Sequence, residues 1–257
     1  MREIRPIRET EAEAFLQHLC DVFKLDFNRA YDPFFQEPFF DLRRKWAIFD
    51  GPQIVCGLQT VPLEFGWGRA VGIAGVATRE SNRGEGLASR LLERVLRESE
   101  RAGEGSALLF AQRTDLYARA GFEPLDRVIR APLPAVTGEY VDALADTGRV
   151  RDLYNAWAEG SPDRLRRDDA RWKYWNWHFR IAQPVGDGYA VIEPSLLREG
   201  LFHRSLGSLP LPNGTEFVGL TSVADALGLT FSTATVELVL MGYRVPGVPQ
   251  MFMTDQF

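Results

Sequence analysis

The sequence predicts a mixed α/β protein with two unequal domains, and three observations carry this prediction. Strand-like and amphipathic helical segments alternate over residues 1–131. A strand of small residues runs into an amphipathic helix through the glycine-rich loop RGEGLA at 83–88. The chain has 257 residues, of which 45% are hydrophobic and 25% charged, so each of two domains could bury a core.

The first domain, 1–131, is predicted from the order of its elements. Apolar spacing behind a capping signal at Thr10 predicts the first helix, and the aromatic, proline-broken stretch 30–46 predicts a loop or a short helical turn. The predicted strands are 2–9, 45–66 with a turn at 50–52, 69–80, 105–112 and a last strand that ends near 131. The predicted helices are 10–25, 86–101 and a short one within 114–124.

Proline and small residues predict a linker at 132–139, followed by a smaller α/β domain at 140–257. A short helix at 222–229 would open with a capping box at Ser222 and Asp225. Its other predicted elements are helices at 146–161 and 167–179, strands at 187–194 and 201–207, and a strand, or a helix passing into one, at 233–245. No clear sequence repeat relates the two halves.

Charge and cysteine content narrow the class of protein. The net charge of -5 argues against nonspecific binding to nucleic acid or to an anionic membrane. Cys20 and Cys56 lack metal-ligand spacing, and the three histidines do not complete a zinc site with them, so we predict no metal. The charged amino terminus is unlike a signal peptide, and no apolar run could span a bilayer. We therefore expect a cytoplasmic protein with reduced thiols.

The loop RGEGLA has the chemistry of an anion site. A helix amino terminus presents unpaired N–H groups, and glycines allow positive φ and the close approach of a phosphate. Arg83 adds a positive charge and Ser89 a hydroxyl group. A tight turn that needs glycine for its geometry alone is the other reading, because the loop is neither G-x-G-x-x-G nor a P-loop.

Three motifs in order resemble the GNAT superfamily of acyl-CoA N-acyltransferases, and most closely its Eis (enhanced intracellular survival) type. They are AGVAT at 74–78, NRGEGL at 82–87 and YARAGF at 117–122. The resemblance implies a GNAT fold over 1–131, with a mixed sheet whose strands splay at a bulge near Gly75. With 257 residues, the chain is expected to lack the sterol-carrier-like third domain of Eis-type proteins. The resemblance also implies that 140–257 is a degenerate GNAT-like domain without a cofactor loop.

The resemblance also implies which residues bind acetyl-CoA as co-substrate. Backbone groups of the 76–78 strand would hold the pantetheine arm, and the loop amides would hold the pyrophosphate. Glu85 would face solvent rather than the phosphates. The predicted cofactor-binding residues are Val76, Ala77, Thr78, Arg83, Gly84, Glu85, Gly86, Leu87, Ala88 and Ser89.

For catalysis, the resemblance makes Tyr117 the acid that protonates the departing thiolate, although a packing role before the 121–122 turn stays open. Arg119 and Phe122 are expected to be structural. The base is less defined. Eis-type enzymes suggest the terminal carboxylate of Phe257, against a frayed tail, and Glu64 is an alternative that a solvated strand face also explains.

The second half is expected to close the acceptor side of the site together with 31–40, where Asp32 and Glu37 would suit an apolar amine with a positive charge. A core-forming loop is the other reading of 31–40. Trp172, Trp175 and Phe179 are spaced as one buried helical stripe, which favours packing over base stacking. The partner is therefore expected to be a small-molecule or lysine-type amine, with no nucleic acid and no membrane. A homo-oligomer is left open.

The sequence thus predicts an acetyl-CoA-dependent N-acetyltransferase that transfers the acetyl group directly to a primary amine in a ternary complex. The alternative is a non-catalytic acyl-CoA-binding sensor or assembly module, because a fold and a cofactor loop do not establish turnover. Acyl-CoA binding without turnover would favour that alternative. The acceptor and the length of the acyl chain are not defined by the sequence.

Overall fold

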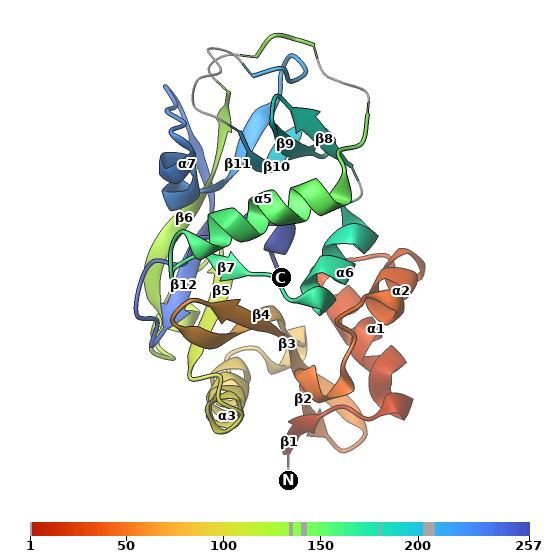
Figure 1. Ribbon diagram of the computed structural model, residues 1–257. Helices are drawn as coiled ribbons and strands as arrows, with labels where there is room; N and C mark the ends of the chain where they lie inside the picture. Colours follow the sequence, from red (N-terminus) through yellow and green to blue (C-terminus); the bar gives the residue numbers. More distant parts are fainter. Residues whose placement is uncertain (1, 134–135, 140–142, 180, 203–208) are drawn as a thin grey trace.

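The computed structural model describes residues 2–133, 136–139, 143–179, 181–202 and 209–257, and these residues form one mixed sheet of 12 strands (Figure 1). The strands are β1 (Glu3–Pro6), β2 (Lys45–Asp50), β3 (Gln53–Phe65), β4 (Gly68–Thr78), β5 (Ser106–Ala111), β6 (Glu123–Pro132), β7 (Leu165–Arg166), β8 (Ala182–Val185), β9 (Gly188–Ile192), β10 (Leu196–Leu201), β11 (Glu216–Leu220) and β12 (Thr235–Tyr243). The predicted mixed α/β class is confirmed.

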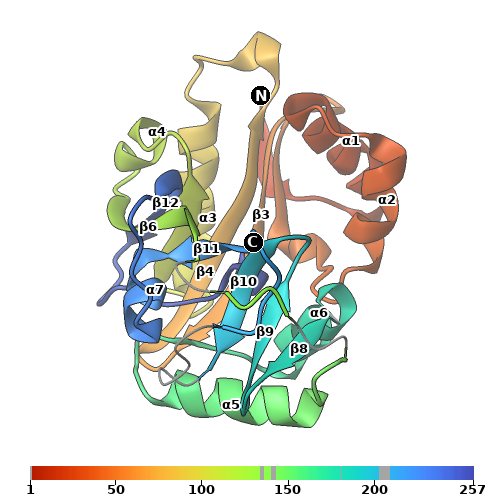
Figure 2. The ribbon, with the colours of Figure 1, turned by 90° about the horizontal axis from the view of Figure 1, so that it is seen from above.

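Helices cover this sheet on both sides. The α-helices are α1 (Ala12–Phe23), α2 (Phe27–Gln36), α3 (Leu87–Arg101), α4 (Asp115–Ala118), α5 (Thr147–Glu159), α6 (Asp169–His178) and α7 (Thr221–Leu227). Short 3-10 turns are η1 (Glu9–Glu11), η2 (Leu42–Arg44), η3 (Glu80–Asn82) and η4 (Met253–Asp255). Figure 2 shows α3 and the pair α1 and α2 on opposite sides of the strands β3 and β4.

The sheet order is β1-β2-β3-β4-β5-β12-β6-β11-β10-β9-β8, and the short strand β7 pairs with β3. The pairs β4–β5 and β10–β11 are parallel, and the other pairs along this path are antiparallel. The strand β12 lies between β5 and β6, although more than 100 residues separate it from either one. One continuous sheet therefore contains strands from before and after the predicted linker. The domain boundary at 132–139 stays a prediction.

Two apolar layers sandwich the first strands. Leu87, Leu91, Leu92 and Val95 on one face of α3 are buried against β2 to β5, as the spacing of these residues predicts. On the other face of the sheet, α1 and α2 bury Phe15, Leu19 and Phe34 against β2, β3 and the end of β4. These two layers hold β4 rigidly where it leaves β5.

Three local predictions were wrong. The stretch 30–46, predicted as a loop or a short helical turn, includes most of the ten-residue helix α2, which begins before it at Phe27. Asp26 caps this helix by accepting from the Arg29 N–H, and the helix tolerates Pro33 within it. Thr10 lies in η1, so it does not cap α1. Ser222 lies inside α7 and donates to Asp126 on β6, because a tertiary partner competes with the local cap.

The buried stripe predicted for the second half is present, since Trp172, Trp175 and Phe179 are all less than 6% exposed. The predicted strand 201–207 falls mostly outside the described residues, and β10 ends at Leu201. In the described part of the linker, Val136 forms a bridge with Leu209. No helix among the described residues combines the length and the apolar character that a membrane span requires.

Candidate functional site: a gap between β4 and β5

The strands β4 and β5 separate partway along their length. They pair in parallel from Ala70↔Ser106 to Ile73↔Leu109, and the described residues contain no further pair between them. The strand β4 continues along β3 as far as Thr78, with a register shift beside Gly75, whose φ is +59°. This is the predicted bulge. It leaves one edge of β4 unpaired.

The bulge determines which backbone groups face the gap. The Arg79 N–H donates to Val55 O on β3 at 3.0 Å. Because successive strand residues direct their backbone groups to alternate sides, those of Ala77 also point toward β3, and those of Val76 and Thr78 point away from it. Val76 and Thr78 line a cavity, whereas the Ala77 carbonyl accepts from His18 Nε2 at 3.2 Å.

His18 therefore holds the bulge from the α1 side. Its ring is buried, and burial lowers the pKa of His18, so the neutral ring that donates to Ala77 persists at neutral pH. No pattern around His18 predicts this contact, because a histidine on a helix face is most often a packing residue.

The glycine-rich loop adopts the conformation that its sequence requires. Gly84 and Gly86 have φ values of +85° and +71°, which side chains rarely adopt. A Cβ atom on either glycine would meet nothing within 4 Å, so the space beside the loop is open. Gly86 is the N-cap of α3 and carries no capping side chain. The first N–H groups of α3 are therefore available to an external anion.

The loop, the free edge of β4 and the short helix α4 enclose one cavity of about 520 Å³. Two exposed arginines, Arg83 and Arg119, face it together with the start of α3, which makes this side of the cavity electropositive. Its lining residues are Val22, Phe23, Val76, Thr78, Asn82, Arg83, Gly84, Gly86, Leu87, Ala88, Ser89, Leu116 and Arg119. Eight of the ten predicted cofactor-binding residues are therefore brought together.

Ala77 and Glu85 are the two that do not line the cavity. Glu85 accepts from Arg2 Nη1 at 2.5 Å and from Asn82 Nδ2 at 2.8 Å. The Arg2 guanidinium, followed by the Asn82 amide, lowers the pKa of Glu85. A carboxylate that faced a phosphate would oppose binding, and this pairing with Arg2 holds it away from the cavity.

Tyr117 lies at the junction of α4 and the sheet. Its half-buried ring packs edge-on against Phe122, with ring centroids 6.3 Å apart. Burial raises the pKa of Tyr117, so the phenol is protonated at neutral pH and can serve as a proton donor. The neighbouring residues Leu116 and Arg119 line the cavity, whereas Tyr117 itself does not.

A second, smaller pocket of about 180 Å³ lies on the other side of the bulge. The sheet register places Lys45, Gln59 and Ala74 side by side across β2, β3 and β4, and this row is part of the pocket wall. Its lining residues are Glu37, Phe39, Arg44, Lys45, Gln59, Thr60, Val61, Ala74, Arg171, Tyr174, Gln256 and Phe257. It therefore combines the 31–40 stretch with residues of the second half.

Lys45 is held inside this wall rather than in solvent. Its Nζ donates to Gln59 Oε1 at 2.8 Å and to Glu37 Oε1 at 3.2 Å, and it lies 4.4 Å and 4.9 Å from the ring centroids of Phe34 and Phe40. Burial lowers the pKa of Lys45, while the Glu37 carboxylate acts in the opposite direction. Lys45 therefore donates two hydrogen bonds to side-chain oxygens, and its charge lies close to two aromatic rings.

The last residues are packed and not frayed. Residues 251–255 are buried, and the Phe257 ring lies 5.4 Å from that of Phe110. The ring also covers Gly72 on β4, where a Cβ would come within 2.8 Å of it. Glu64, the alternative base, is exposed and lies opposite Arg69 in the register of β3 and β4, near the other end of β4. It does not line the pocket.

We expect Gly72→Ala to destabilise the protein by about 1–3 kcal/mol, because the new methyl group overlaps both Val61 and the Phe257 ring. Chemical denaturation measures this loss. Gly105→Ala is the matched control: its Cβ would meet nothing within 4 Å and its φ is not positive, so it should be neutral or slightly stabilising. Equal stability of the two variants would contradict the packing assigned to Phe257.

A buried charge network anchors this carboxyl-terminal segment. The Arg167 guanidinium donates to both Asp255 oxygens and to both Glu199 oxygens, at 2.7–3.2 Å. Glu199 also accepts from Trp175 Nε1 at 3.0 Å and from the hydroxyls of Tyr189 and Thr254. The side chains of the three charged residues are at most 1% exposed. The network thereby ties η4 to β10 and α6.

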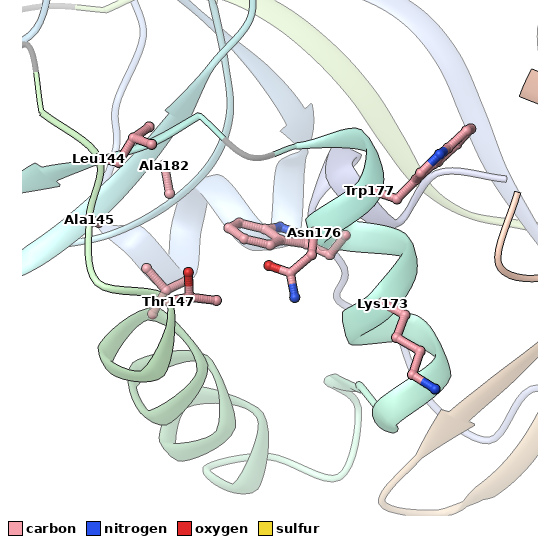
Figure 3. A pocket seen from close by; sticks show the side chains of 9 residues that line it. Leu144, Ala145, Thr147, Lys173, Asn176, Trp177 and Ala182 are labelled. Carbon is pink, nitrogen blue, oxygen red and sulfur yellow. The ribbon is translucent and has the colours of Figure 1, made fainter.

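A third cavity of about 550 Å³ lies between the start of α5, the helix α6 and β8 (Figure 3). Thr147 of α5 and Asn176 of α6 lie on either side of it, and Lys173 and Trp177 are on the side of α6 turned away from α5. None of the residues predicted for acetyl-CoA binding or catalysis lines this cavity. It is therefore separate from the candidate site.

Comparison with known proteins agrees with this geometry. Residues 3–125 match the family model described as an acetyltransferase (GNAT) domain. The match covers slightly less than half of the chain. The gap between β4 and β5 and the glycine-rich loop both lie within the matched residues. A search of curated protein sequences found no significant match.

Solved structures show that the fold extends over nearly the whole chain. A GCN5-related N-acetyltransferase of Kribbella flavida has a TM-score of 0.69 and 18% identity, covering 94% of this chain and 70% of its own. A GCN5-related N-acetyltransferase of Anabaena variabilis has a TM-score of 0.63 and 18% identity, with coverages of 94% and 72%. Eis1 of Mycobacterium abscessus has a TM-score of 0.61 and 15% identity, with coverages of 93% and 73%. At such identities the likeness concerns the fold alone.

Sequence reasoning missed several lining residues. Arg119 was expected to be structural, yet it faces the larger cavity, and nothing in its local sequence indicates this. Arg171, in the predicted helix 167–179, lines the smaller pocket and is only 4% exposed. Its spacing of four residues from Trp175 places both on one helix face, which was an available sign of burial. Lys45 at the start of an apolar strand carried no comparable sign.

Proposed function

We propose that the protein is an acyl-CoA-dependent N-acyltransferase that moves an acetyl group from acetyl-CoA to a primary amine. The observation that carries this proposal is that the free edge of β4 and the open glycine-rich loop face one cavity of about 520 Å³. Neither a simple turn nor a packing role would require both features to face the same space. The proposal includes a relation to Eis-type enzymes, which the likeness in fold to Eis1 supports.

The loop and its neighbours fit an acyl-CoA molecule in charge and in shape. The first N–H groups of α3, with Arg83 and Arg119, would bind the pyrophosphate. The backbone groups of Val76 and Thr78 would pair with the amides of the pantetheine arm, as a neighbouring strand would. The empty space beside Gly84 and Gly86 is what a Cβ would fill, which supports close approach of a phosphate.

The chemistry we propose is direct transfer between two bound reactants. The amine nitrogen forms a bond to the carbonyl carbon, the carbon–sulfur bond breaks, and Tyr117 gives its proton to the departing sulfur. The proton released by the amine passes to solvent, and Tyr117 regains a proton from there. A carboxylate at Phe257 as the base stays a prediction, and Glu37 is a second carboxylate of the same pocket.

We further propose that the second half shapes the acceptor pocket. Arg171 and Tyr174 of α6 lie opposite Glu37 and Phe39 in the smaller pocket, which supports the predicted closure of the acceptor side. Asp32 lies outside this pocket and accepts from Gln36 on the exposed side of α2. A pocket shared by both halves would let each half bind one reactant beside the bulge.

Calorimetric titration of acetyl-CoA tests the proposal. We expect Gly86→Glu to weaken binding by about 10- to 100-fold, because a side chain at positive φ strains the loop and its carboxylate repels the pyrophosphate. Gly51→Glu is the matched control: Gly51 has φ +59° and equally open space, but it lies in the turn between β2 and β3. It should lose stability without losing affinity.

The outcomes separate the enzyme from the alternative function. Failure of the wild-type protein to bind acetyl-CoA would refute the proposal. Binding that Gly86→Glu abolishes, together with thiol release when an amine is added, would support an enzyme. Binding of the same kind without turnover of any amine would favour an acyl-CoA-binding sensor or assembly module.

A further inference from the structure

We infer that the acceptor is a small zwitterion, an amino acid or a similar molecule that carries an amine and a carboxylate together. This inference rests on the proposed function, because it concerns the amine that the acetyl group would reach. It comes from the size of the smaller pocket, from a buried arginine with unused donors, and from the balance of charge around both.

The smaller pocket limits the size of the acceptor. Its volume of about 180 Å³ is well below the roughly 300–1,000 Å³ of pockets that enclose drug-sized ligands. Its walls come from three directions: the segment that follows α2, the row Lys45, Gln59 and Ala74, and α6 with the carboxyl-terminal segment. An amine of amino-acid size fits such a space, and a multi-ring amine does not.

Arg171 supplies the first recognition group. Its guanidinium is 4% exposed, lines the pocket, and donates to Pro62 O at 2.7 Å. Its Nη1 lies 3.6 Å from Asp255 Oδ1, beyond hydrogen-bond distance, because Asp255 is already held by Arg167. Among the described residues the Arg171 guanidinium makes this one hydrogen bond, beside its ion pair with Asp255 and its contact with the Phe39 ring, so some of its five N–H donors are left for a ligand. A carboxylate is the ligand that such a fork of donors binds best.

Glu37 supplies the complementary group. Its Oε1 accepts from Lys45, and within the part of the chain that the structure describes, its Oε2 accepts no hydrogen bond. The Glu37 side chain is 26% exposed and lines the pocket. An ammonium group of the acceptor would bind to Oε2 before it loses its proton for attack. Lys45 is held by its own contacts within the protein, so it positions Glu37.

The charged side chains around the pocket are balanced. Lys45 pairs with Glu37 and Arg44 with Glu104, and the buried set Arg167, Arg171, Glu199 and Asp255 carries two positive and two negative charges. Binding an isolated cation or anion would leave a charge without a partner in a partly buried pocket, which is costly. A zwitterion adds one charge of each sign and offers a partner to both Arg171 and Glu37.

The test measures thiol release from acetyl-CoA with matched acceptor pairs: glycine and methylamine, leucine and isoamylamine, phenylalanine and phenethylamine. Spermidine and kanamycin represent larger cationic amines. Each amino acid should have a kcat/KM at least about 10-fold above that of its matched amine. Arg171→Gln should lower kcat/KM for amino acids by about 10- to 100-fold, mainly through KM, and leave the matched amines unchanged.

Glu37→Gln should instead weaken both members of each pair alike, because both carry the amine. Arg164→Gln is the control: this half-buried arginine donates to Trp157 O and Gln250 outside the pocket, so it should not alter the preference. If Arg171→Gln fails to fold, Arg171→Lys keeps the charge but loses the fork, and it should show the same loss in smaller measure.

The failures can be told apart. No calorimetric binding of acetyl-CoA would overturn the proposed function and this inference with it. Turnover of the matched amines, spermidine or kanamycin without turnover of any amino acid would overturn the inference alone, and so would a preference for those amines. Acetyl-CoA binding without turnover of any acceptor would overturn both the enzyme proposal and the inference. An Arg171→Gln variant that loses amino acids and amines equally would also overturn it.

Discussion

Tyr117→Phe is expected to lower kcat by about 10²- to 10⁴-fold while leaving the affinity for acetyl-CoA unchanged. This is the range that a positioned general acid contributes, and phenylalanine removes only the hydroxyl group. Because burial raises the pKa of Tyr117, the wild-type phenol keeps its proton at neutral pH and can release it to the departing sulfur. Steady-state kinetics with a good acceptor, together with calorimetric titration, measure the two quantities separately.

Tyr243→Phe is the matched control. The Tyr243 ring packs against the same Phe122 ring, with centroids 5.7 Å apart, on strand β12. Its loss of a hydroxyl should therefore leave kcat within about threefold of the wild type, since it keeps the packing of this cluster. A Tyr117→Phe enzyme as active as Tyr243→Phe would assign Tyr117 to packing alone.

Arg167→Met is expected to destabilise the protein by about 3–5 kcal/mol, the range measured when one partner of a buried ion pair is removed. The substitution leaves Glu199 and Asp255 charged, fully buried and without their shared partner. Several hydrogen bonds are lost with it, including one to Thr254 at 2.9 Å. Urea denaturation, with the slope checked for two-state behaviour, gives the change in free energy of unfolding.

Arg130→Met controls for the loss of an arginine as such. Arg130 pairs with Glu216 on the adjacent strand β11, where the side chains are 41% and 33% exposed. Such a pair contributes about 0–1 kcal/mol, so this variant should unfold almost as the wild type does. If Arg167→Met and Arg130→Met lowered the free energy of unfolding by the same small amount, the buried network would not be what anchors the carboxyl-terminal segment.

The local features of the proposed cofactor side could be predicted from residues that are neighbours in the sequence. Gly84 and Gly86 lie at positive φ at the start of α3, as the pattern between a strand and an amphipathic helix predicts. Gly75 marks the bulge, and the spacing of Leu87, Leu91 and Val95 predicted the buried face of α3. Each of these depends on residues within one or two turns of each other, so the chemistry of neighbours in sequence is enough to predict them.

The contacts that the predicted site residues make with distant parts of the chain could not be predicted from the sequence. A Glu85 carboxylate that faced the cavity would oppose phosphate binding. Arg2, 83 residues away in the sequence, donates to this carboxylate and holds it aside. The Ala77 carbonyl is occupied by His18 of α1. Neither partner has any pattern that points to the other, because a single hydrogen bond across the fold leaves no periodicity in the sequence.

Which residues form the proposed acceptor pocket could not be predicted without the tertiary structure. The strand β12 reaches its place between β5 and β6 from more than 100 residues away, and the short turn η4 follows it into the centre of the molecule. The pocket then brings Glu37, Lys45 and Arg171 together from three distant segments. Sequence spacing constrains positions along one helix or strand, whereas a pocket depends on which elements pair and in which register. The sequence alone therefore predicted the residues of the proposed acyl-CoA side, whereas the proposed acceptor side could be described only from the fold.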